Sequence, residues 1–279
     1  MKYYKELLTI GIPAYNEAKY IKKTIESCID QAGCVIISDN ASTDDTQKIC
    51  EELANKYPNL KYIRQQKNIG GTANFNFVLN QTKTKYFMWM GGHDYLDENY
   101  TKHMIHMLEN SDSSGCHPAS RNVDSNDVEI GIYDCWYSNR LTSDHPLQRV
   151  YSLIAHLHEV SLLFGIYRTE FAQKYPLKSI LGNDHVFVCN MALEGKIIYS
   201  PRSIYNWRQT KFGLSDQDNV KIWQNSLGNS ENKIALSRKE MQQDQLNILK
   251  KCSTRGYGFF KKIFLVNKAQ KKLRKRFGD

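Results

Sequence analysis

Short apolar runs alternate with amphipathic stretches along the first hundred residues of the chain. The apolar runs have the length of buried strands, and the stretches between them have the 3.6-residue period of helices. Strands that alternate with helices predict an α/β fold, with a mostly parallel sheet and crossover helices. The predicted strands cover residues 7–12, 34–38, 60–64 and 86–90, and the predicted helices cover residues 17–31, 45–57 and 72–80.

The pattern weakens in the second half of the chain. Residues 111–146 are polar and rich in turn formers, which indicates variable loops or edge strands. Residues 216–252 are polar and helix-prone. The remaining predictions are helices over 97–110, 147–158 and 184–194, and strands over 161–167, 196–199 and 204–207.

Positive charge is concentrated at the carboxyl end. Residues 255–279 contain nine Lys or Arg and one acid, so they account for +8 of the net charge of +9. The same segment has an apolar helical face, which predicts a basic amphipathic helix able to lie on an anionic membrane surface. The alternative is that residues 259–266 pack on the body and the basic end is only solvated. No nucleic-acid partner is expected. The residues on that face are Phe259, Ile263, Val266, Gln270, Leu273 and Phe277.

Several protein classes are disfavoured by the rest of the sequence. The seven cysteines are scattered without a C-x-x-C pair, which argues against a disulfide framework and a zinc ribbon. The longest uncharged apolar stretch, residues 160–167, is far shorter than the roughly 20 residues of a membrane span. Pro13 interrupts the apolar run near the amino end, and no signal-peptide cleavage site follows. A cytoplasmic location is therefore expected.

Polar loops follow each of the four amino-terminal strands. Because ligands of open α/β sheets bind beyond the carboxyl ends of the strands, these loops are the candidate site. Glycines in the third loop permit a close backbone approach to a ligand, and the His-Asp pair in the fourth could hold a metal. The loops are P-A-Y-N-E at 13–17, D-N-A-S-T-D-D at 39–45, N-I-G-G at 68–71 and G-G-H-D at 91–94.

The motifs TIGIPAYNE and IISDNASTDDT, with N-I-G-G and an acidic loop after them, resemble the family-2 glycosyltransferases of the GT-A fold. The resemblance covers roughly residues 7–210. It implies a Rossmann-like sheet flanked by helices, with a helical carboxyl-terminal extension. On this basis we divide the chain into a nucleotide-sugar-binding half (1–110), an acceptor-binding half (111–215) and an extension (216–279) that ends in the basic helix.

The resemblance assigns nucleotide contacts to the first three loops. Asp39 is expected to accept a hydrogen bond from N3–H of uracil, a donor that thymine shares and cytosine lacks, so a UDP- or dTDP-sugar is the predicted donor. The alternative for Asp39 is a turn or helix cap, and for Glu17 an acid at a helix start. The other predicted nucleotide-sugar contacts are Pro13, Tyr15, Asn16, Glu17, Asn40, Ser42, Gly70, Asn74, His93 and Arg208.

The fourth loop departs from the family pattern. The family has D-x-D-D before an x-Leu pair, whereas this chain has G-G-H-D. Asp94 matches the final acid, which implies that it touches the divalent cation on the donor diphosphate, Mn²⁺ or Mg²⁺. His93 is a candidate second ligand, and imidazole suits Mn²⁺ better than Mg²⁺. The alternative for His93 is a loop histidine bonded to backbone.

The resemblance also supplies the catalytic roles. Asp184 matches the carboxylate that accepts the proton of the acceptor hydroxyl, with a helix-start acid as its alternative. Arg208 matches a basic residue that steadies the diphosphate. The predicted activity is inverting sugar transfer to a glycan or lipid-linked acceptor, such as a polysaccharide or lipopolysaccharide, at the inner face of the cell membrane. The rivals are a non-catalytic sugar-nucleotide-binding module with a degenerate metal loop, and a nucleotidyltransferase, which residues 13–17 disfavour because they are neither glycine-rich nor basic.

Overall fold

The computed structural model describes residues 3–133, 135, 137–157, 161–209, 231–252 and 259–277, and in the last two helices the side chains of residues 238–252 and 263–275. In these residues nine strands form one sheet in the order β3-β2-β1-β4-β8-β6-β9-β5, with β7 paired to β6. The strands are β1 (Leu8–Ala14), β2 (Cys34–Asp39), β3 (Leu60–Arg64), β4 (Tyr86–Trp89), β5 (Tyr95–Leu96), β6 (Gly115–Val123), β7 (Glu129–Tyr133), β8 (Ile166–Arg168) and β9 (Ile197–Arg208).

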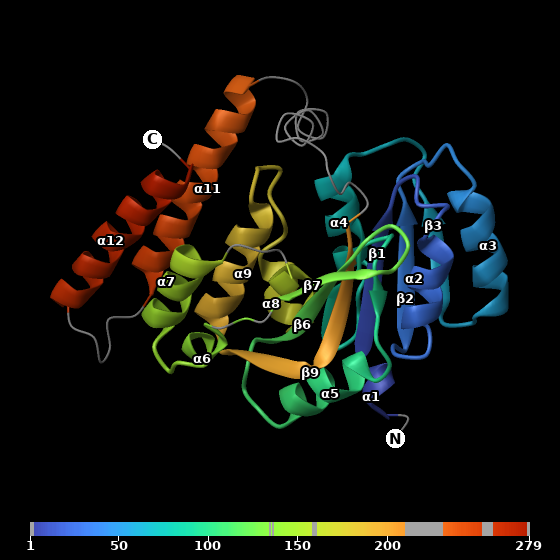
Figure 1. Ribbon diagram of the computed structural model, residues 1–279, viewed down its shortest axis with the longest axis horizontal. Coiled ribbons are helices and arrows are strands. Elements are labelled where there is room, and N and C mark those ends of the chain that lie inside the picture. The colour runs from blue at the N-terminus through green and yellow to red at the C-terminus, as the bar shows by residue number, and fades with distance from the viewer. Residues whose placement is uncertain are drawn as a thin grey trace.

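Helices flank the sheet on both sides (Figure 1). The α2 and α3 helices lie at the end near β2 and β3, whereas α7, α9, α11 and α12 gather at the other end. The helices are α1 (Tyr3–Glu6), α2 (Ile21–Cys28), α3 (Thr46–Lys56), α4 (Gly71–Asn80), α5 (Tyr100–Glu109), α6 (Ser138–Leu141), α7 (Pro146–His156), α8 (Thr169–Lys174), α9 (Asn183–Glu194), α11 (Glu231–Lys251) and α12 (Phe259–Phe277), with the 3₁₀ turn η1 (Ser161–Phe164).

The amino-terminal half confirms the α/β prediction. Strands β1 to β4 pair in parallel. The inner strands β1, β2 and β4 are mostly apolar, as expected of strands covered on both faces, whereas the edge strand β3 carries Lys61 and Arg64. The register pairs Ala14 with Asp39 and Asp39 with Arg64. This register brings the carboxyl ends of three strands side by side.

The prediction of loops or edge strands over 111–146 is wrong for β6. That strand lies inside the sheet, parallel to β9 and antiparallel to β8, and it makes the second half of the sheet mixed. The polar composition of β6 does not give the apolar pattern that predicts a buried strand. Pro118 lies where the register between β6 and β9 shifts, and a strand tolerates proline at such an irregularity. The two strands predicted over 196–207 are one strand, β9, interrupted at that same irregularity. The strand predicted over 161–167 is a 3₁₀ turn followed by β8.

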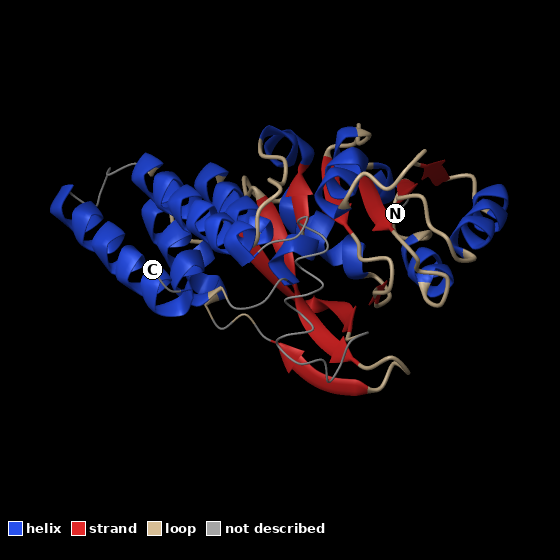
Figure 2. Ribbon diagram, turned by 90° about the horizontal axis from the view of Figure 1, so that it is seen from above, coloured by secondary structure: helices blue, strands red, loops and turns tan. Residues whose placement is uncertain are grey.

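The carboxyl-terminal helices pack on the body beside α7 and α9 (Figures 1 and 2). In α12, Ala269 and Leu273 are buried, whereas Ile263 and Phe264 are 42% and 62% exposed. The apolar face of α12 therefore divides into a packed part and an exposed part, while the side chains of Phe259 and Phe277 lie outside the described residues. All seven cysteines lie in the described part of the chain, and none forms a disulfide. No helix there is long and apolar enough to cross a membrane.

Candidate active site

The loops after β1 and β2 are joined by hydrogen bonds at the carboxyl-end rim of the sheet. The backbone N–H of Asn16 donates to Ser42 Oγ at 2.9 Å, and the backbone N–H of Thr43 donates to Asn16 Oδ1 at 2.8 Å. The Glu17 amide donates to Thr46 Oγ1 at 2.8 Å. Asn16 has a positive φ of 56°, which asparagine tolerates better than most residues. The two loops form one rigid edge.

The loop before α4 is tied to the same edge. Asn40 accepts a hydrogen bond from the Ile69 amide at 2.8 Å and donates one to Asn68 at 2.9 Å. Gly70 has a φ of 86°, a conformation that L side chains rarely adopt. The structure thus brings three of the four predicted loops together.

Asp39 is completely buried beneath this rim. Its Oδ1 accepts the Ser42 amide at 2.8 Å, and its Oδ2 accepts Tyr62 Oη at 2.7 Å and Arg64 Nη1 at 2.6 Å. Burial would raise the pKa of Asp39, but the hydrogen bonds from these three residues hold it below its usual value. Arg64 also donates to the Ser42 carbonyl, so it lies over the carboxylate. A uracil contact therefore requires Arg64 to share or leave Asp39.

Sequence reasoning missed Tyr62 and Arg64 as partners of Asp39. They are two residues apart on β3 and therefore point to the same face of the sheet. Arg64 also ends its strand opposite Asp39 in the register. The rule that identified Asp39 at a strand end applies equally to Arg64 and could have found it.

The remaining residues predicted to contact nucleotide differ in accessibility. Tyr15 is 45% exposed at the rim, and Pro13 is half-buried in β1. Asn74 is buried, donates to the Ser38 carbonyl at 2.9 Å and accepts Ser38 Oγ at 2.5 Å. In this arrangement Asn74 holds the end of β2, and contact with nucleotide stays a prediction for it.

The two glycines of the fourth loop make room for neighbouring carboxylates. A Cβ at position 91 would lie 2.2 Å from Asp94 Oδ2, and one at position 92 would lie 2.8 Å from Glu17 Cγ. Asp94 is buried, with Oδ1 accepting the Arg208 amide at 2.8 Å and Oδ2 accepting Tyr205 Oη at 2.6 Å. Burial raises the pKa of Asp94 above its usual value, although His93 and these hydrogen bonds oppose the rise.

His93 is paired with Glu17 across the rim. Its Nδ1 lies 2.9 Å from Glu17 Oε1, and its Nε2 lies 3.9 Å from Asp94 Oδ1. Burial alone would lower the pKa of His93, but the hydrogen bond to Glu17 and the charges of Asp94 and Glu17 raise it. The alternative of a backbone-bonded loop histidine does not describe this ring, because its Nδ1 partner is a carboxylate.

The side chains at the fourth loop are too few to hold a divalent cation without further ligands from a diphosphate or water. In the parts of the chain that the structure describes, no group of three His, Cys, Asp or Glu side chains could hold a metal alone. His93 Nε2, with the carboxylate of Asp94 near it, offers an incomplete site that phosphate oxygens and water could complete. Whether Asp94 ligates directly stays a prediction, since both its oxygens already accept hydrogen bonds.

Arg208 ends β9 directly behind the fourth loop. Its guanidinium donates to the His93 carbonyl, pairs with Asp127 from the β6–β7 turn, and lies 4.3 Å from the Tyr20 ring centroid. Lys23 reaches the same Asp127 carboxylate at 2.8 Å. Burial would raise the pKa of Asp127, but the two cations hold it below its usual value. Arg208 is 2% exposed, so contact with a diphosphate requires Asp127 to move aside and stays a prediction.

Asp184 lies in the first turn of α9, which packs against the centre of the sheet. Phe187, one turn further, meets the Trp89 ring edge-to-face at a centroid distance of 4.9 Å. Asn183 Nδ2 lies 3.4 Å from Thr72 Oγ1 in the first turn of α4. The start of α9 is therefore beside the loop that contains Gly70. A role of Asp184 toward the acceptor stays a prediction.

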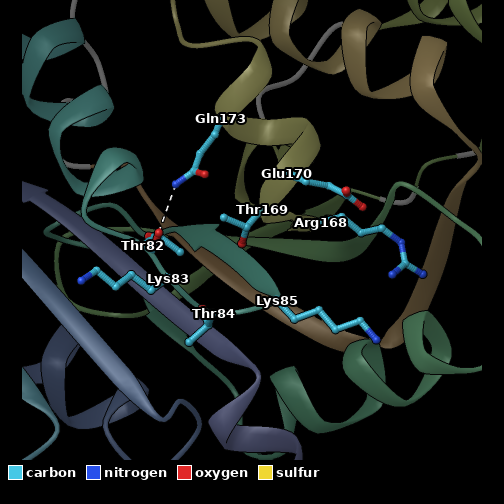
Figure 3. Close-up of a pocket in the computed structure, with 8 residues that line it drawn as sticks. All are labelled: Thr82, Lys83, Thr84, Lys85, Arg168, Thr169, Glu170 and Gln173. Carbon is cyan, nitrogen blue, oxygen red and sulfur yellow. Dashed lines mark hydrogen bonds between the residues drawn. The ribbon is translucent and has the colours of Figure 1, made fainter.

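A hollow of about 410 Å³ lies elsewhere on the molecule (Figure 3). It is lined by the residues before β4 and by the end of β8 and the start of α8. Because those residues precede β4, the hollow is at the amino ends of the parallel strands, opposite the rim. It plays no part in the candidate site.

Comparison with known families agrees with this geometry. Residues 9–170 match the model of glycosyl transferase family 2. The chain belongs to that family. The family-2 match covers more than half of the chain and includes all four rim loops, but it ends before Asp184 and Arg208. The roles of those two residues stay predictions.

Individual relatives and solved structures extend the comparison. Glycosyltransferase GlyA of Streptococcus pneumoniae is 22% identical over 241 residues, which is 75% of this chain and 31% of GlyA. This chain therefore spans less than a third of that relative. The structure of residues 1–349 of S. aureus TarS with UDP-GlcNAc has a TM-score of 0.59 at 16% identity, over 97% of this chain and 82% of that fragment. Mannosyltransferase PcManGT from Pyrobaculum calidifontis, solved with GDP-Man and Mn²⁺, has a TM-score of 0.57 at 15% identity, over 99% and 83%. The structural likenesses establish the GT-A fold.

Proposed function

We propose that this chain is an inverting glycosyltransferase that uses a UDP- or dTDP-sugar. The observation that carries the proposal is the rim itself, where Asp39, the loop of His93 and the start of α9 gather at the carboxyl ends of a parallel sheet in a family-2 chain. The UDP-GlcNAc in the TarS structure supports a uracil nucleotide, whereas the GDP-Man in the PcManGT structure supports only a nucleotide-sugar donor in general.

The proposed reaction is a single in-line displacement. Asp184 accepts the proton of the acceptor hydroxyl while the oxygen attacks the anomeric carbon from the face opposite the nucleotide. The bond to the diphosphate breaks, and the nucleoside diphosphate leaves. A bound Mn²⁺ or Mg²⁺ would offset the negative charge that grows on the leaving group. His93 and Asp94 are the residues proposed to hold that cation.

A donor screen tests the nucleotide assignment. Thermal shifts are measured with UDP-, dTDP-, GDP- and CMP-sugars in the presence of Mn²⁺, since stabilisation grows with ligand concentration relative to the dissociation constant. We expect shifts with the uracil and thymine nucleotides and none with CMP-sugars. A shift with GDP-sugars alone would contradict the role of Asp39 and would agree with the donor seen in PcManGT.

Asp184→Asn separates transfer from binding. Because general-base catalysis contributes roughly 10²–10⁴-fold, the variant should lose at least about 100-fold in turnover while UDP affinity by calorimetry stays nearly unchanged. The matched control is Asp244→Asn, an acid on α11 that pairs with Lys178. A wild-type protein that binds UDP-sugar but neither transfers nor hydrolyses it would favour the binding-module alternative.

We also propose that the acceptor is a glycan or lipid-linked chain at the cytoplasmic face of the membrane, reached through α12. The support is the exposed pair Ile263 and Phe264 on a helix that also exposes Lys268, Lys271 and Lys275, with Lys268 Nζ 5.9 Å from the Phe264 ring centroid. Phe264→Glu should reduce co-sedimentation with anionic vesicles. Val128→Glu, at a 59% exposed position in the β6–β7 turn, is the matched control. Equal vesicle binding by both variants and the wild type would defeat this part of the proposal.

A further inference from the structure

Glu17 and the fourth loop are fitted to each other. Glu17 follows β1, His93 follows β4, and the two side chains meet through Oε1 and Nδ1 at 2.9 Å. The Glu17 side chain is 18% exposed and that of His93 is 29% exposed. A side chain at position 92 would displace Glu17, since a Cβ there would lie 2.8 Å from its Cγ. The hydrogen bond between Glu17 and His93 therefore depends on glycine at position 92.

The hydrogen bond determines what the other ring nitrogen can do. An ionised carboxylate only accepts, so His93 must carry its hydrogen on Nδ1. In the neutral ring Nε2 then has a free lone pair, and within the described residues no hydrogen bond to Nε2 is formed. The nearest carboxylate oxygen to it is Asp94 Oδ1 at 3.9 Å. A carboxylate on one imidazole nitrogen is the usual partner of a metal on the other, because it fixes the ring and raises its basicity.

We propose that Glu17 is a positioning residue that orients His93 so that Nε2 ligates the cation of the donor diphosphate. The cation site is then a nitrogen site in place of the oxygen site of an acidic loop. Since imidazole suits Mn²⁺ and Mg²⁺ prefers oxygen, this exchange favours Mn²⁺. The inference rests on the proposed function, because the diphosphate supplies the remaining ligands.

Pulsed electron paramagnetic resonance of Mn²⁺ with UDP and the full chain tests the nitrogen ligand directly. The wild type should show a ¹⁴N coupling that ¹⁵N-histidine labelling changes. His93→Asp should bind Mn²⁺ without that coupling and should bind Mg²⁺ more tightly than the wild type does. His106→Asn is the matched control, because His106 is an exposed histidine on α5 and its loss should leave the coupling intact.

Variants of Glu17 test the positioning role. Glu17→Ala should weaken Mn²⁺ binding by about 10–100-fold in the presence of UDP, the usual cost of losing such a partner. Glu17→Gln keeps an oxygen that accepts from Nδ1, so it should retain the coupling and lose less affinity. Gly92→Ala should resemble Glu17→Ala because its Cβ displaces the glutamate. Thermal melts and UDP affinity without metal identify any variant that is damaged more widely.

The outcomes separate the inference from the proposed function. If the wild type binds UDP and Mn²⁺ together without a nitrogen coupling, the inference is wrong and the proposed function stands. If Glu17→Ala changes neither the coupling nor the Mn²⁺ affinity, Glu17 has no positioning role. If neither UDP nor dTDP binds, with or without a cation, the proposed function itself fails.

Discussion

Replacing Asp39 by Asn should destabilise the fold before any ligand is considered. The carboxylate is fully buried and accepts from Ser42, Tyr62 and Arg64 at 2.6–2.8 Å. An Asn side chain has one oxygen for these three donors, and its NH₂ group cannot accept from the guanidinium. Tyr62 can rotate its hydroxyl to accept from that NH₂ group, so the contact with Arg64 is the one that is lost.

The expected cost follows from that single loss. A hydrogen bond to a charged group contributes about 1.5–3 kcal/mol, and Arg64 can recover part of it in water because its side chain is 33% exposed. We expect Asp39→Asn to lower the free energy of unfolding by about 2 kcal/mol, or roughly 4–8 °C in Tm for a chain of this size. Tyr62→Phe, which removes one hydrogen bond and no charge, should cost about 1 kcal/mol.

The pH dependence gives the refuting test. The folded-state pKa of Asp39 is lowered, so its contribution is complete above the unfolded value of about 4 and is lost as the pH falls through the folded value. Melts of the wild type and Asp39→Asn should differ at pH 7 and converge toward pH 3. A difference that persists unchanged at pH 3, or an Asp39→Asn variant no less stable than Tyr62→Phe, would refute the charge argument.

Three further predictions concern the rim and its support. Gly91→Asp, which restores the family's first acid, should lower Tm and leave Mn²⁺ affinity no higher by titration, because its Cβ would lie 2.2 Å from Asp94 Oδ2. Asp127→Asn should tighten UDP binding by about tenfold in calorimetry if Arg208 reaches the diphosphate, given about 1.5–3 kcal/mol per charge-assisted bond; unchanged affinity would confine Arg208 to supporting the loop. Phe187→Ala should cost about 3–5 kcal/mol in denaturant unfolding, because the ring is buried against Trp89; a cost below about 1 kcal/mol would show that this contact does not hold α9.

The amino-terminal half could be predicted from sequence because β1, β2 and β4 are mostly apolar runs that alternate with amphipathic helices. The second half could not, because β6 is buried while carrying His117, Ser120 and Asn122. A hydropathy pattern identifies a strand only when the buried side chains of that strand are apolar. The position of β6 inside the sheet follows instead from its pairing with β8 and β9, which are distant in the sequence, so no local pattern predicts it.

The same distinction separates the site residues that were predicted from those that were missed. Asp39 and His93 follow strands, so position along the chain was enough to select them. The pair of Arg208 with Asp127 depends on the turn between β6 and β7, which lies in the region predicted as variable loops or edge strands. The contact of Glu17 with His93 joins two loops that are 76 residues apart. Contacts between side chains on distant loops depend on the order and register of the strands, so they can be identified only from the whole sheet.

The fourth loop also bears on the choice between an enzyme and a binding module that has lost its metal site. A loop that had only decayed would leave buried charges without partners, at a cost of several kcal/mol for each ion. Here Asp94 is bound by Tyr205 and Arg208, and His93 is bound by Glu17. The glycines stand where the carboxylates of Asp94 and Glu17 leave no room for a side chain. The departures from the acidic pattern are thus mutually fitted, so Gly91 and Gly92 do not by themselves favour a binding module over the proposed transfer reaction.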